Sequence, residues 1–364
     1  MKKHNPDNER IKRTYLRFLK ESKGRNESSI DSVAMALSRF ETHTKHRDFK
    51  KFHYEQAIRF KKHLSEQNNR QTGKKLSKST LNTTFGHLKN FFKWLAMQPG
   101  YKSRVNYTDA EYFNLSEKDT RIATAHHVKP SPSLEQVKHV INMMPSETVI
   151  ERRDRALIAF TLVTGARDSA IASMKLKHVD LSENSVYQDA REVRTKFSKT
   201  FKTYFFPVGD DIHKIVKDWV NFLRDDLMWS DDDPLFPKTA ISLGDNQLFE
   251  ASGFKREHWS TATPIREIFK KAFTSADLPY YNPHSLRKTL TRLGQQMCQS
   301  IEHFKAWSQN LGHEQVLTTL TSYGEVQTER QGEIIKNLDL PNHSDHLNVE
   351  ELAKAVVREM KNTN

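Results

Sequence analysis

Apolar residues recur at helical spacing through the first hundred residues of the chain, with apolar positions three or four residues apart. The segments that show this pattern are residues 11–19, 30–40, 54–64 and 81–95. Ser28 and Ser29 precede the second segment and Ser79 precedes the fourth, where a hydroxyl group can cap the first turn of a helix. Four amphipathic helices of this length predict a small helical bundle.

The helical period fades between Pro99 and Pro132, where polar residues, tyrosine, lysine and histidine dominate, as is typical of an interdomain linker. A new helix is predicted from Ser133, because a serine followed closely by a glutamate suits a helix N-terminus. Residues 154–163 are apolar on almost every side, which predicts a helix buried in a larger core. Gly165 is predicted to end that helix.

Further along, short β-rich segments replace the helical period. They are Ser-Val-Tyr at 185–187, Glu-Val-Arg-Thr at 192–195 and Tyr-Phe-Phe-Pro-Val at 204–208. Segments of this kind predict a small antiparallel sheet. Helical spacing then returns at residues 211–228, 263–276, 284–298, 301–309 and 314–322, and an apolar stripe between 349 and 360 predicts a terminal helix. The Asp-rich residues 229–260 match no single element.

These patterns together predict a mainly α protein with a small antiparallel β-sheet. With 364 residues, the chain is long enough for two domains that each have a core. The predicted division is an N-terminal helical domain at residues 1–100, a linker at 101–130, a second domain at 131–345 and a C-terminal helix at 346–364.

The charge of the chain points to the kind of partner. A net charge of +13 and a pI near 9.5 favour a polyanion, although a merely soluble basic protein has the same balance. Lysines gather on and between the third and fourth predicted helices, at Lys61, Lys62, Lys74, Lys75, Lys78, Lys89 and Lys93. Each alone is more simply a solvated residue, but crowded like charges repel unless a polyanion offsets them. The residues expected to contact phosphates of such a polyanion are Lys74, Lys75, Lys78, Lys89 and Lys93.

Other classes of protein are disfavoured by the sequence. No apolar run approaches the length of a membrane span, and the first residues lack the apolar core of a signal peptide. Cys298 is the only cysteine, which excludes an internal disulfide and a thiolate zinc cluster. We therefore expect a cytoplasmic, nucleoid-associated protein without contact to a membrane.

Candidate chemistry concentrates near the end of the second predicted domain. Asn-Pro-His-Ser-Leu-Arg-Lys occupies residues 282–288, Asn-Leu-Gly-His occupies 310–313 and Thr-Ser-Tyr-Gly occupies 321–324. His284 and Arg287 are three residues apart, so on a helical turn both side chains point the same way. Tyr323 lies ten residues after His313, within chain reach of the same place. One site is thus offered two histidines, an arginine and a tyrosine.

Two upstream motifs complete an ordered set. Thr-Gly-Ala-Arg occupies residues 164–167, after the predicted buried helix, and Ser-Lys-Thr-Phe-Lys occupies 198–202, before Pro207. The order of these motifs resembles the catalytic signature of the tyrosine recombinases, the phage integrase family, over about half of the chain. Any one of these residues alone is more simply structural, so the interpretation depends on their joint order.

The resemblance implies a site-specific DNA recombinase or integrase, which cuts and rejoins duplex DNA by transesterification. Tyr323 would attack a phosphodiester and form a 3′-phosphotyrosyl enzyme, so that no ATP, metal or other cofactor is required. Arg167 and Arg287 would hold the phosphate oxygens on which negative charge grows in the transition state.

The remaining matched residues are implied to take part in proton transfer. His284 and His313, whose charge ordinarily changes near neutral pH, would bind the phosphate and assist the transfer. Lys199, on a hairpin, would protonate the leaving 5′ oxygen, with Lys196 and Lys202 as close rivals.

The resemblance also extends to fold and assembly. The N-terminal helices resemble the core-binding (SAM-like) domain of the family in helix number and charge, and residues 131–345 are similar to its catalytic domain. The implied assembly is a homo-tetramer on paired sites of double-stranded DNA, in which the helix at 346–364 is exchanged between protomers. Accessory DNA-bending proteins are further expected partners.

Two departures accompany the resemblance. The family often has an acidic residue where this chain has Ala170, which leaves Asp168 as a candidate acidic support for Arg167. Tyr323 lies one residue later than is common, and one residue turns a helical side chain by about 100°. Two other functions fit the same residues. One is a catalytically inactive, sequence-specific DNA-binding protein on this scaffold, and the other is a metal-dependent nuclease built from the histidines.

Overall fold

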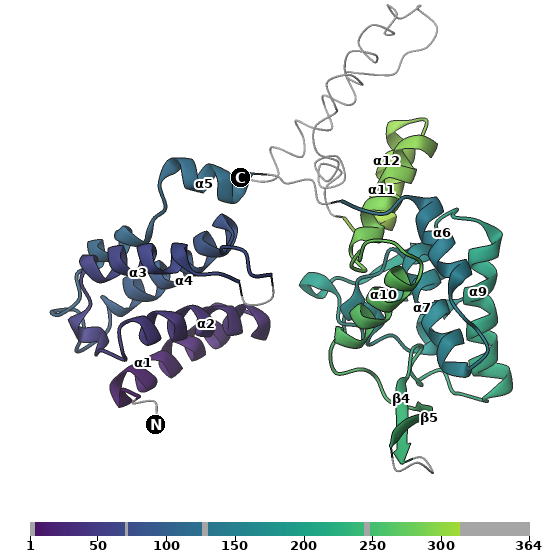
Figure 1. The fold of residues 1–364 in the computed structure, drawn as a ribbon, viewed down its shortest axis with the longest axis horizontal. Coiled ribbons are helices and arrows are strands. Elements are labelled where there is room, and N and C mark those ends of the chain that lie inside the picture. The colour runs from purple at the N-terminus through teal and green to yellow at the C-terminus, as the bar shows by residue number, and fades with distance from the viewer. Residues whose placement is uncertain (1–3, 70–71, 126–129, 244–247, 314–364) are drawn as a thin grey trace, which may run out of the picture. The chain divides into compact units, whose positions relative to one another are not determined.

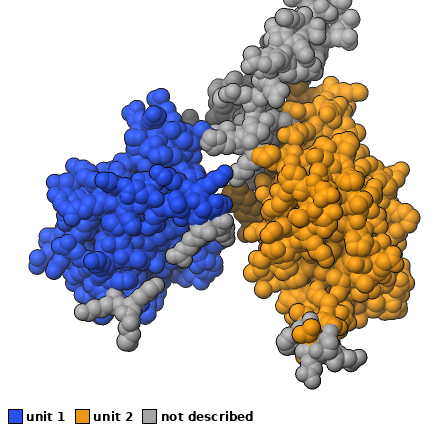
Figure 2. Space-filling model, viewed as in Figure 1, with its two compact units in different colours: residues 1–126 blue, residues 127–364 orange. Residues whose placement is uncertain are grey.

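A computed structural model describes residues 4–69, 72–125, 130–243 and 248–313 of the chain. The chain divides into two compact units, Met1–His126 and His127–Asn364 (Figure 2). Each unit has its own hydrophobic core. Helices dominate both units, and the strands that the structure describes all belong to the second (Figure 1).

The four predicted N-terminal helices are confirmed. The unit contains α1 (Pro6–Arg17), the π-helical turn η1 (Phe18–Ser22), α2 (Glu27–His43), η2 (Phe49–Lys51), α3 (Tyr54–Glu66), α4 (Lys78–Leu95), η3 (Tyr107–Phe113) and α5 (Glu117–Thr124). The Asn26 side chain caps α2 by accepting a hydrogen bond of 2.9 Å from the Ser29 N–H. Ser77 caps α4 in the same way through the Thr80 N–H at 3.2 Å. Both caps therefore precede the serines that the sequence suggested.

Packed phenylalanines form the core of the N-terminal unit. The centroid of the Phe52 ring lies 3.7 Å from that of Phe92 and 5.8 Å from that of Phe113. Phe113 ends η3, in the stretch predicted to be a linker, and Tyr101 and Val105 of the same stretch are also buried in this core. The first part of the expected linker is therefore a structural part of the unit. Its pattern is missed because a 3₁₀ helix such as η3 repeats about every three residues and not every 3.6.

A buried helix is central to the C-terminal unit. The unit contains α6 (Leu134–Met143), α7 (Val149–Thr164), α8 (Asp168–Ile171), η4 (Leu176–His178), β1 (Val179–Asp180), β2 (Ser185–Gln188), η5 (Lys196–Ser198), β3 (Phe201–Tyr204), α9 (Asp210–Asn221), η6 (Phe222–Asp226), β4 (Lys238–Leu243), β5 (Phe249–Lys255), α10 (Thr263–Ser275), α11 (Ser285–Met297) and α12 (Ile301–Asn310). Helix α7 contacts α6, α9, α10 and α11 (Figure 1). Every α7 residue from Ala156 to Thr164 is buried, and Gly165 ends the helix in the left-handed conformation at φ 59°. Both predictions for this helix are confirmed.

The predicted antiparallel sheet is present with the strand order β1-β2-β3, and Val186 pairs with Thr203. Residues 192–195 are not a strand, because the Val193 N–H donates to the Asp189 carbonyl at 2.7 Å and closes a turn. The third strand also lies earlier than predicted and ends at Tyr204. A second antiparallel pair, β4 and β5, lies within residues 229–260, where the sequence matched no element.

Several predictions fall outside the described residues, namely the helix at 314–322, Tyr323 and the terminal helix at 346–364. The last described residue, His313, closes the Asn-Leu-Gly-His motif. Among the described residues, no helix has the length and apolar character that a membrane span requires.

Candidate active site

Arg287 joins three segments of the C-terminal unit. It lies on α11, and only 4% of the residue is exposed. One guanidinium nitrogen, Nη1, donates a hydrogen bond of 2.6 Å to the carbonyl of Gly165, at the end of α7. The other, Nη2, donates to the carbonyl of Leu311 at 2.6 Å and to Nε2 of His313 at 2.8 Å. Because arginine can only donate, Nε2 of His313 is the acceptor in this contact.

The buried charge of Arg287 has no counterion among the described residues, since all three of its partners are uncharged acceptors. Burial, and then the nearby charge of Arg167, lower the pKa of Arg287 to about 9. A buried charge in a protein normally has a partner of opposite charge, whereas the charged neighbour of Arg287, Arg167, is also positive. The arrangement therefore favours binding of an anion.

Arg167 supplies the second positive charge. It directly precedes α8 and is half-buried, and burial lowers its pKa. Within the described part of the chain, its guanidinium donates no hydrogen bond. Asp168, the candidate acidic support, instead accepts a hydrogen bond of 2.7 Å from Arg266 of α10 and one of 2.8 Å from the Ser169 N–H. The suggested pairing of Arg167 with Asp168 is thus not observed, and Arg266 is a neighbour that the sequence analysis missed.

The two predicted histidines share this positive surrounding. Burial and the charges of Arg287 and Arg167 lower the pKa of His313 to about 3. Desolvation and the same two arginines lower the pKa of His284 to about 4. His284 remains exposed at the surface, so repulsion by the arginines is the better-supported cause there. The expectation that these histidines change charge near neutral pH is therefore corrected for the protein alone, in which both are neutral at pH 7.

The lysine hairpin lies beside the same cluster. The charge of Lys199 contributes to the lowered pKa of His313, and that of Lys196 contributes to the lowered pKa of His284. Lys202 differs, because its Nζ lies 4.9 Å from the centroid of the Tyr204 ring, on the opposite face of β3 from Thr203. Strand alternation thus separates Lys202 from the site and leaves Lys199 and Lys196 as the two neighbouring candidates.

The end of α12 is fixed on β3 by residues that the sequence analysis did not single out. The Asn310 side chain accepts a hydrogen bond from the Tyr204 N–H at 2.7 Å and donates one to the Tyr204 carbonyl at 2.9 Å. Gly312 has φ 69°, and a Cβ there would lie 2.7 Å from the Phe201 ring. These contacts hold His313 next to Arg287. Their only sequence signal is the Asn-Leu-Gly-His motif itself.

The lysines expected to bind DNA occupy two kinds of environment in the N-terminal unit. Lys74 and Lys75 are exposed in the connection between α3 and α4. Lys78, by contrast, forms an ion pair of 2.9 Å with Asp119 of α5.

Lys89 and Lys93 both pair with Glu111 of η3, with a Lys89–Glu111 distance of 2.7 Å. Hydrogen bonds from Lys89 and then Lys93 lower the pKa of Glu111 to about 2. Carboxylates of the same unit therefore offset much of the lysine crowding. The repulsion argument for a bound polyanion holds for Lys74 and Lys75 but is weakened for the three paired lysines.

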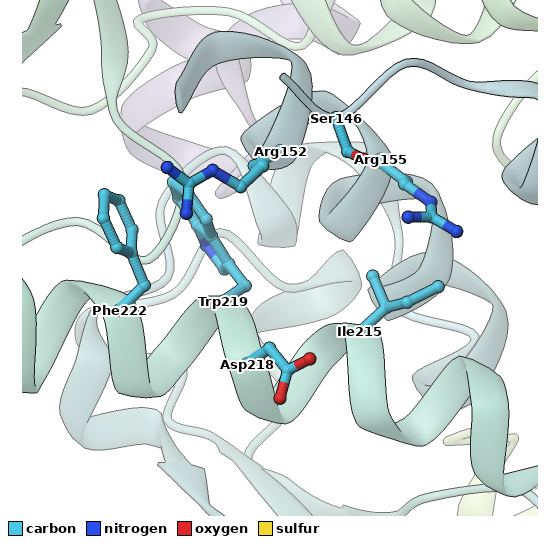
Figure 3. Close-up of a pocket in the computed structure, with 7 residues that line it drawn as sticks. All are labelled: Ser146, Arg152, Arg155, Ile215, Asp218, Trp219 and Phe222. Carbon is cyan, nitrogen blue, oxygen red and sulfur yellow. The ribbon is translucent and has the colours of Figure 1, made fainter. Parts of the chain in front are cut away.

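A pocket lies elsewhere in the C-terminal unit, between α7 and α9 (Figure 3). It has a volume of about 180 Å³ and is lined by Ser146, Arg152, Arg155, Ile215, Asp218, Trp219 and Phe222. The Arg152 guanidinium lies 4.6 Å from the centroid of the Phe222 ring. None of the predicted catalytic residues lines this pocket, so it is separate from the arginine–histidine cluster.

A metal-dependent nuclease would need several ligands around one cation. Among the described residues, no group of three or more histidine, cysteine or carboxylate side chains is placed to hold a metal ion. Both site histidines are instead surrounded by positive charge from Arg287 and Arg167, which repels a metal cation.

We expect the lowered pKa of His313 to make the protein less stable in acid. The unfolded chain takes up the proton near pH 6.5, whereas the folded protein takes it up only near pH 3. This contribution to stability is therefore complete above about pH 6.5 and is lost as the pH falls toward 3. His313→Asn, which keeps an acceptor for Arg287 but does not titrate, should lose less thermal stability than the wild type between about pH 7 and about pH 4.5.

The matched control is His303→Asn, which changes an exposed histidine on α12. Thermal unfolding of the three proteins at both pH values is the measurement. An identical pH dependence in the wild type and His313→Asn would contradict the assignment of a neutral, acceptor histidine beside Arg287.

A family model and similar proteins found by sequence point to the same family. A model described as the phage integrase family matches residues 133–330. Tyrosine recombinase XerC from Lactobacillus delbrueckii subsp. bulgaricus is 24% identical over 251 residues, which cover 68% of this chain and 72% of that protein. Tyrosine recombinase XerC from Lactobacillus leichmannii has the same identity and coverage.

Solved structures show the same fold at lower identity. A lambda integrase dimer bound to a COC′ core site matches with a TM-score of 0.59 and 12% identity, covering 92% of this chain and 80% of that chain. The Tn1549 transposon integrase in complex with transposon right end DNA matches with a TM-score of 0.59 and 14% identity, covering 90% and 99% of the respective chains. The predicted fold class, a helical N-terminal part followed by a mainly α part with small antiparallel sheets, is thereby confirmed.

Proposed function

Because the chain belongs to the phage integrase family, we propose that it is a site-specific DNA recombinase that cuts and rejoins duplex DNA through a 3′-phosphotyrosyl intermediate. The observation that carries the proposal is the buried Arg287, which has only neutral partners among the described residues and lies near Arg167. A DNA phosphodiester supplies the anion that this pair favours.

The two arginines act on the charge that develops during the reaction. In-line attack on a phosphodiester increases negative charge on the two non-bridging oxygens, and fixed donors at those oxygens stabilise the transition state. Arg287 is held rigidly by Gly165 and Leu311, so little reorganisation is needed when the charge grows. Arg167 contributes the second guanidinium.

Tyr323 is the proposed nucleophile. Its phenolic oxygen forms a bond to phosphorus as the bond from phosphorus to the 5′ oxygen breaks, and the phenolic proton passes to a neighbouring base. His284 is suited to this role, because it is neutral in the protein alone and exposed. A bound phosphate would raise the pKa of both histidines by adding negative charge. The 5′ oxygen receives a proton from Lys199, and the reverse attack rejoins the strand without ATP.

The test is covalent capture on DNA. Duplexes from the two ends of the genomic segment that carries this gene are nicked beside the candidate cleavage positions, so that the cut fragment diffuses away. We expect a protein–DNA adduct that survives denaturation and disappears after protease treatment. Sequence-selective binding without any adduct would instead support the catalytically inactive DNA-binding protein.

Lys199→Ala is expected to slow cleavage by about 10²–10⁴-fold, because the leaving oxygen loses its proton donor. A substrate with sulfur in place of the bridging 5′ oxygen needs no such proton, so cleavage of this substrate should be almost unchanged. Single-turnover adduct formation on both substrates is the measurement. Lys202→Ala is the matched control, because Lys202 lies on the face of β3 opposite to Thr203, which contacts the end of α12. If sulfur does not rescue Lys199→Ala, the donor is Lys196 or a histidine.

The assembly on DNA belongs to the same proposal. We propose that four protomers bind paired double-stranded sites in the cytoplasm, that residues 346–364 connect neighbouring protomers, and that accessory DNA-bending proteins take part. The lambda integrase that resembles this chain was solved as a dimer on a core site. Mass photometry on paired sites tests this, and a mass of only two protomers would exclude the tetramer. Exposed Lys74 and Lys75 are the proposed phosphate contacts of the N-terminal unit.

A further inference from the structure

A strained, exposed phenylalanine lies at the tip of the segment that joins β2 to β3. Phe197 is 79% exposed, the largest fraction for a large apolar side chain in the described part of the chain. Its backbone has φ 60° and ψ 25°, and Ser198 after it has φ 51°. The left-handed region is unfavourable for a bulky side chain, and exposure of the ring adds no burial to offset it. Strain of this kind is retained where the surrounding structure imposes it, often at functional sites.

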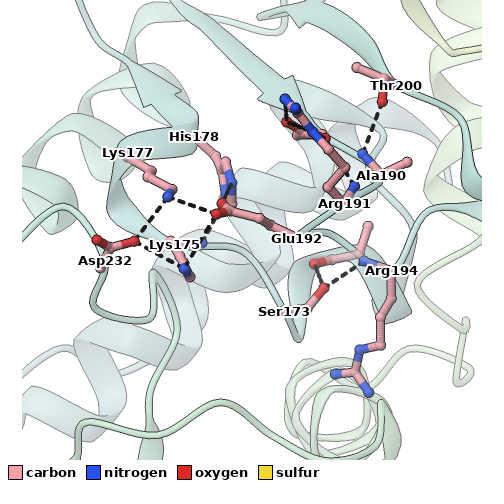
Figure 4. Close-up of polar contacts among 12 residues, drawn as sticks. Ser173, Lys175, Lys177, His178, Ala190, Arg191, Glu192, Arg194, Thr200 and Asp232 are labelled. Carbon is pink, nitrogen blue, oxygen red and sulfur yellow. Dashed lines mark hydrogen bonds and ion pairs between the residues drawn. The ribbon is translucent and has the colours of Figure 1, made fainter.

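Arg194 holds the start of the segment that carries Phe197 (Figure 4). The Arg194 guanidinium donates hydrogen bonds to the carbonyls of Trp259 at 2.7 Å and Ser260 at 2.6 Å. Its backbone N–H donates to the Ser173 hydroxyl at 2.9 Å. Across the segment, the Ala190 N–H donates to the Thr200 hydroxyl at 3.0 Å. These hydrogen bonds fix both ends of the segment that carries Phe197.

One lysine lies beside the ring, and a second follows in the same short segment. The Lys196 Nζ lies 4.7 Å from the centroid of the Phe197 ring, and Lys199 follows two residues later. At one end of the segment, the Ser169 hydroxyl, two residues after Arg167, donates a hydrogen bond of 3.3 Å to the Arg194 carbonyl. At the other end, the Phe201 ring would lie 2.7 Å from a Cβ at Gly312, the residue before His313. The segment that carries Phe197 therefore borders the arginine–histidine cluster. An exposed apolar ring with a cation beside it, next to an anion site, fits a ligand that alternates phosphates with flat apolar faces.

We propose that Phe197 is an aromatic wedge that stacks on a base next to the scissile phosphate and opens the base step there. This inference rests on the proposed recombinase function. It adds a residue that would recognise how easily the base step at the cleavage position opens. Apolar side chains that enter between base pairs unstack them and kink the duplex. The Lys196 ammonium would move from the ring to a backbone phosphate as the base takes its place.

The first test measures unstacking directly and does not depend on cleavage. A duplex that carries 2-aminopurine beside the cleavage position should fluoresce more strongly when the wild-type protein binds, because the base leaves its stack. Phe197→Ala should bind without this increase, and Phe197→Trp should retain it. Met228→Ala is the matched control, because Met228 is also apolar, 77% exposed and at positive φ, but lies in another loop.

The second test measures cleavage. On an intact duplex, Phe197→Ala should form the adduct about ten- to a hundredfold more slowly, the range expected for loss of one base–aromatic stack. A mismatch at the same step, which opens it in advance, should restore the rate. Phe197→Asn suits left-handed backbone, so it should lose the rate without losing thermal stability.

The outcomes separate the two proposals. If the wild type unstacks the base but forms no adduct, the recombinase proposal fails and the wedge stands. If the wild type forms the adduct and Phe197→Ala matches it in rate and fluorescence, the wedge is overturned and the recombinase proposal stands. If Phe197→Asn unfolds more readily than the wild type, the residue has a structural role and the wedge is also overturned.

Discussion

Tyr323→Phe is expected to abolish strand cleavage and leave DNA binding unchanged. The substitution removes only the phenolic oxygen, which is the atom proposed to bond to phosphorus. Loss of a covalent nucleophile in an enzyme typically lowers the rate by about 10⁴-fold or more, because the chemical route itself is lost. Adduct formation on the nicked duplex measures the first part, and a mobility shift on the intact duplex measures the second.

Tyr204→Phe is the matched control, since Tyr204 is exposed on β3 and is not proposed to take part in the reaction. No other tyrosine follows His313 in the sequence, so a second phenol from the same region cannot take over. An adduct formed by Tyr323→Phe at the wild-type rate would refute the nucleophile assignment.

Arg287→Lys is expected to lower the cleavage rate by about 10²–10³-fold while the positive charge is kept. A lysine ammonium has no planar fork, so it cannot reach the carbonyls of Gly165 and Leu311 and still orient donors toward a phosphate. At least one buried carbonyl then loses its partner, which should cost about 1–3 kcal/mol of unfolding free energy. Single-turnover cleavage and urea unfolding measure the two effects.

Arg292→Lys is the control for a general change on α11, because the Arg292 guanidinium donates only a long hydrogen bond of 3.4 Å, to the Ser131 carbonyl, within the described part of the chain. It should cleave like the wild type. Wild-type cleavage by Arg287→Lys would mean that a bidentate guanidinium at this place is not needed, and the anion-site argument would fall.

Sequence patterns predicted the elements that have either a regular helical spacing of apolar residues or an almost unbroken apolar run. Helix α7 is the clearest case, because residues that are apolar on every side have no position to take except the core. The 3₁₀ helix η3 was missed because its period differs, although Phe113 is a core residue. The turn at 192–195 resembled a strand in composition. In the structure the Val193 N–H closes the turn on the Asp189 carbonyl, and Arg194 is held by the carbonyls of Trp259 and Ser260.

The site was predicted as a set of residues but not as a set of interactions. Spacing placed His284 and Arg287 on one side of a helix, and the structure brings Arg167 and His313 to the same place. The sequence did not reveal that Asp168 pairs with Arg266, because that contact joins residues 98 positions apart. The role of Tyr323 stays a prediction, since it lies outside the described residues.

The predicted DNA-binding surface was overestimated because only the lysines were counted and not the carboxylates near them. Lys89 and Lys93 suggested a surface in need of a polyanion, but Glu111 lies between them and neutralises much of their charge. That carboxylate comes from the stretch interpreted as a linker, so the misplaced boundary and the overstated repulsion have the same origin.

The hydrogen bonds from Arg287 to Gly165 and Leu311 join positions separated by 122 and 24 residues, and all of them lie within one polypeptide. Folding of a single chain is therefore enough to position the Arg287 guanidinium of the proposed active site. Under the proposed mechanism, the protein gains no control from positioning this cation only when it is needed. Control over unwanted strand breaks then falls to the step that brings the Tyr323 phenol to the phosphate.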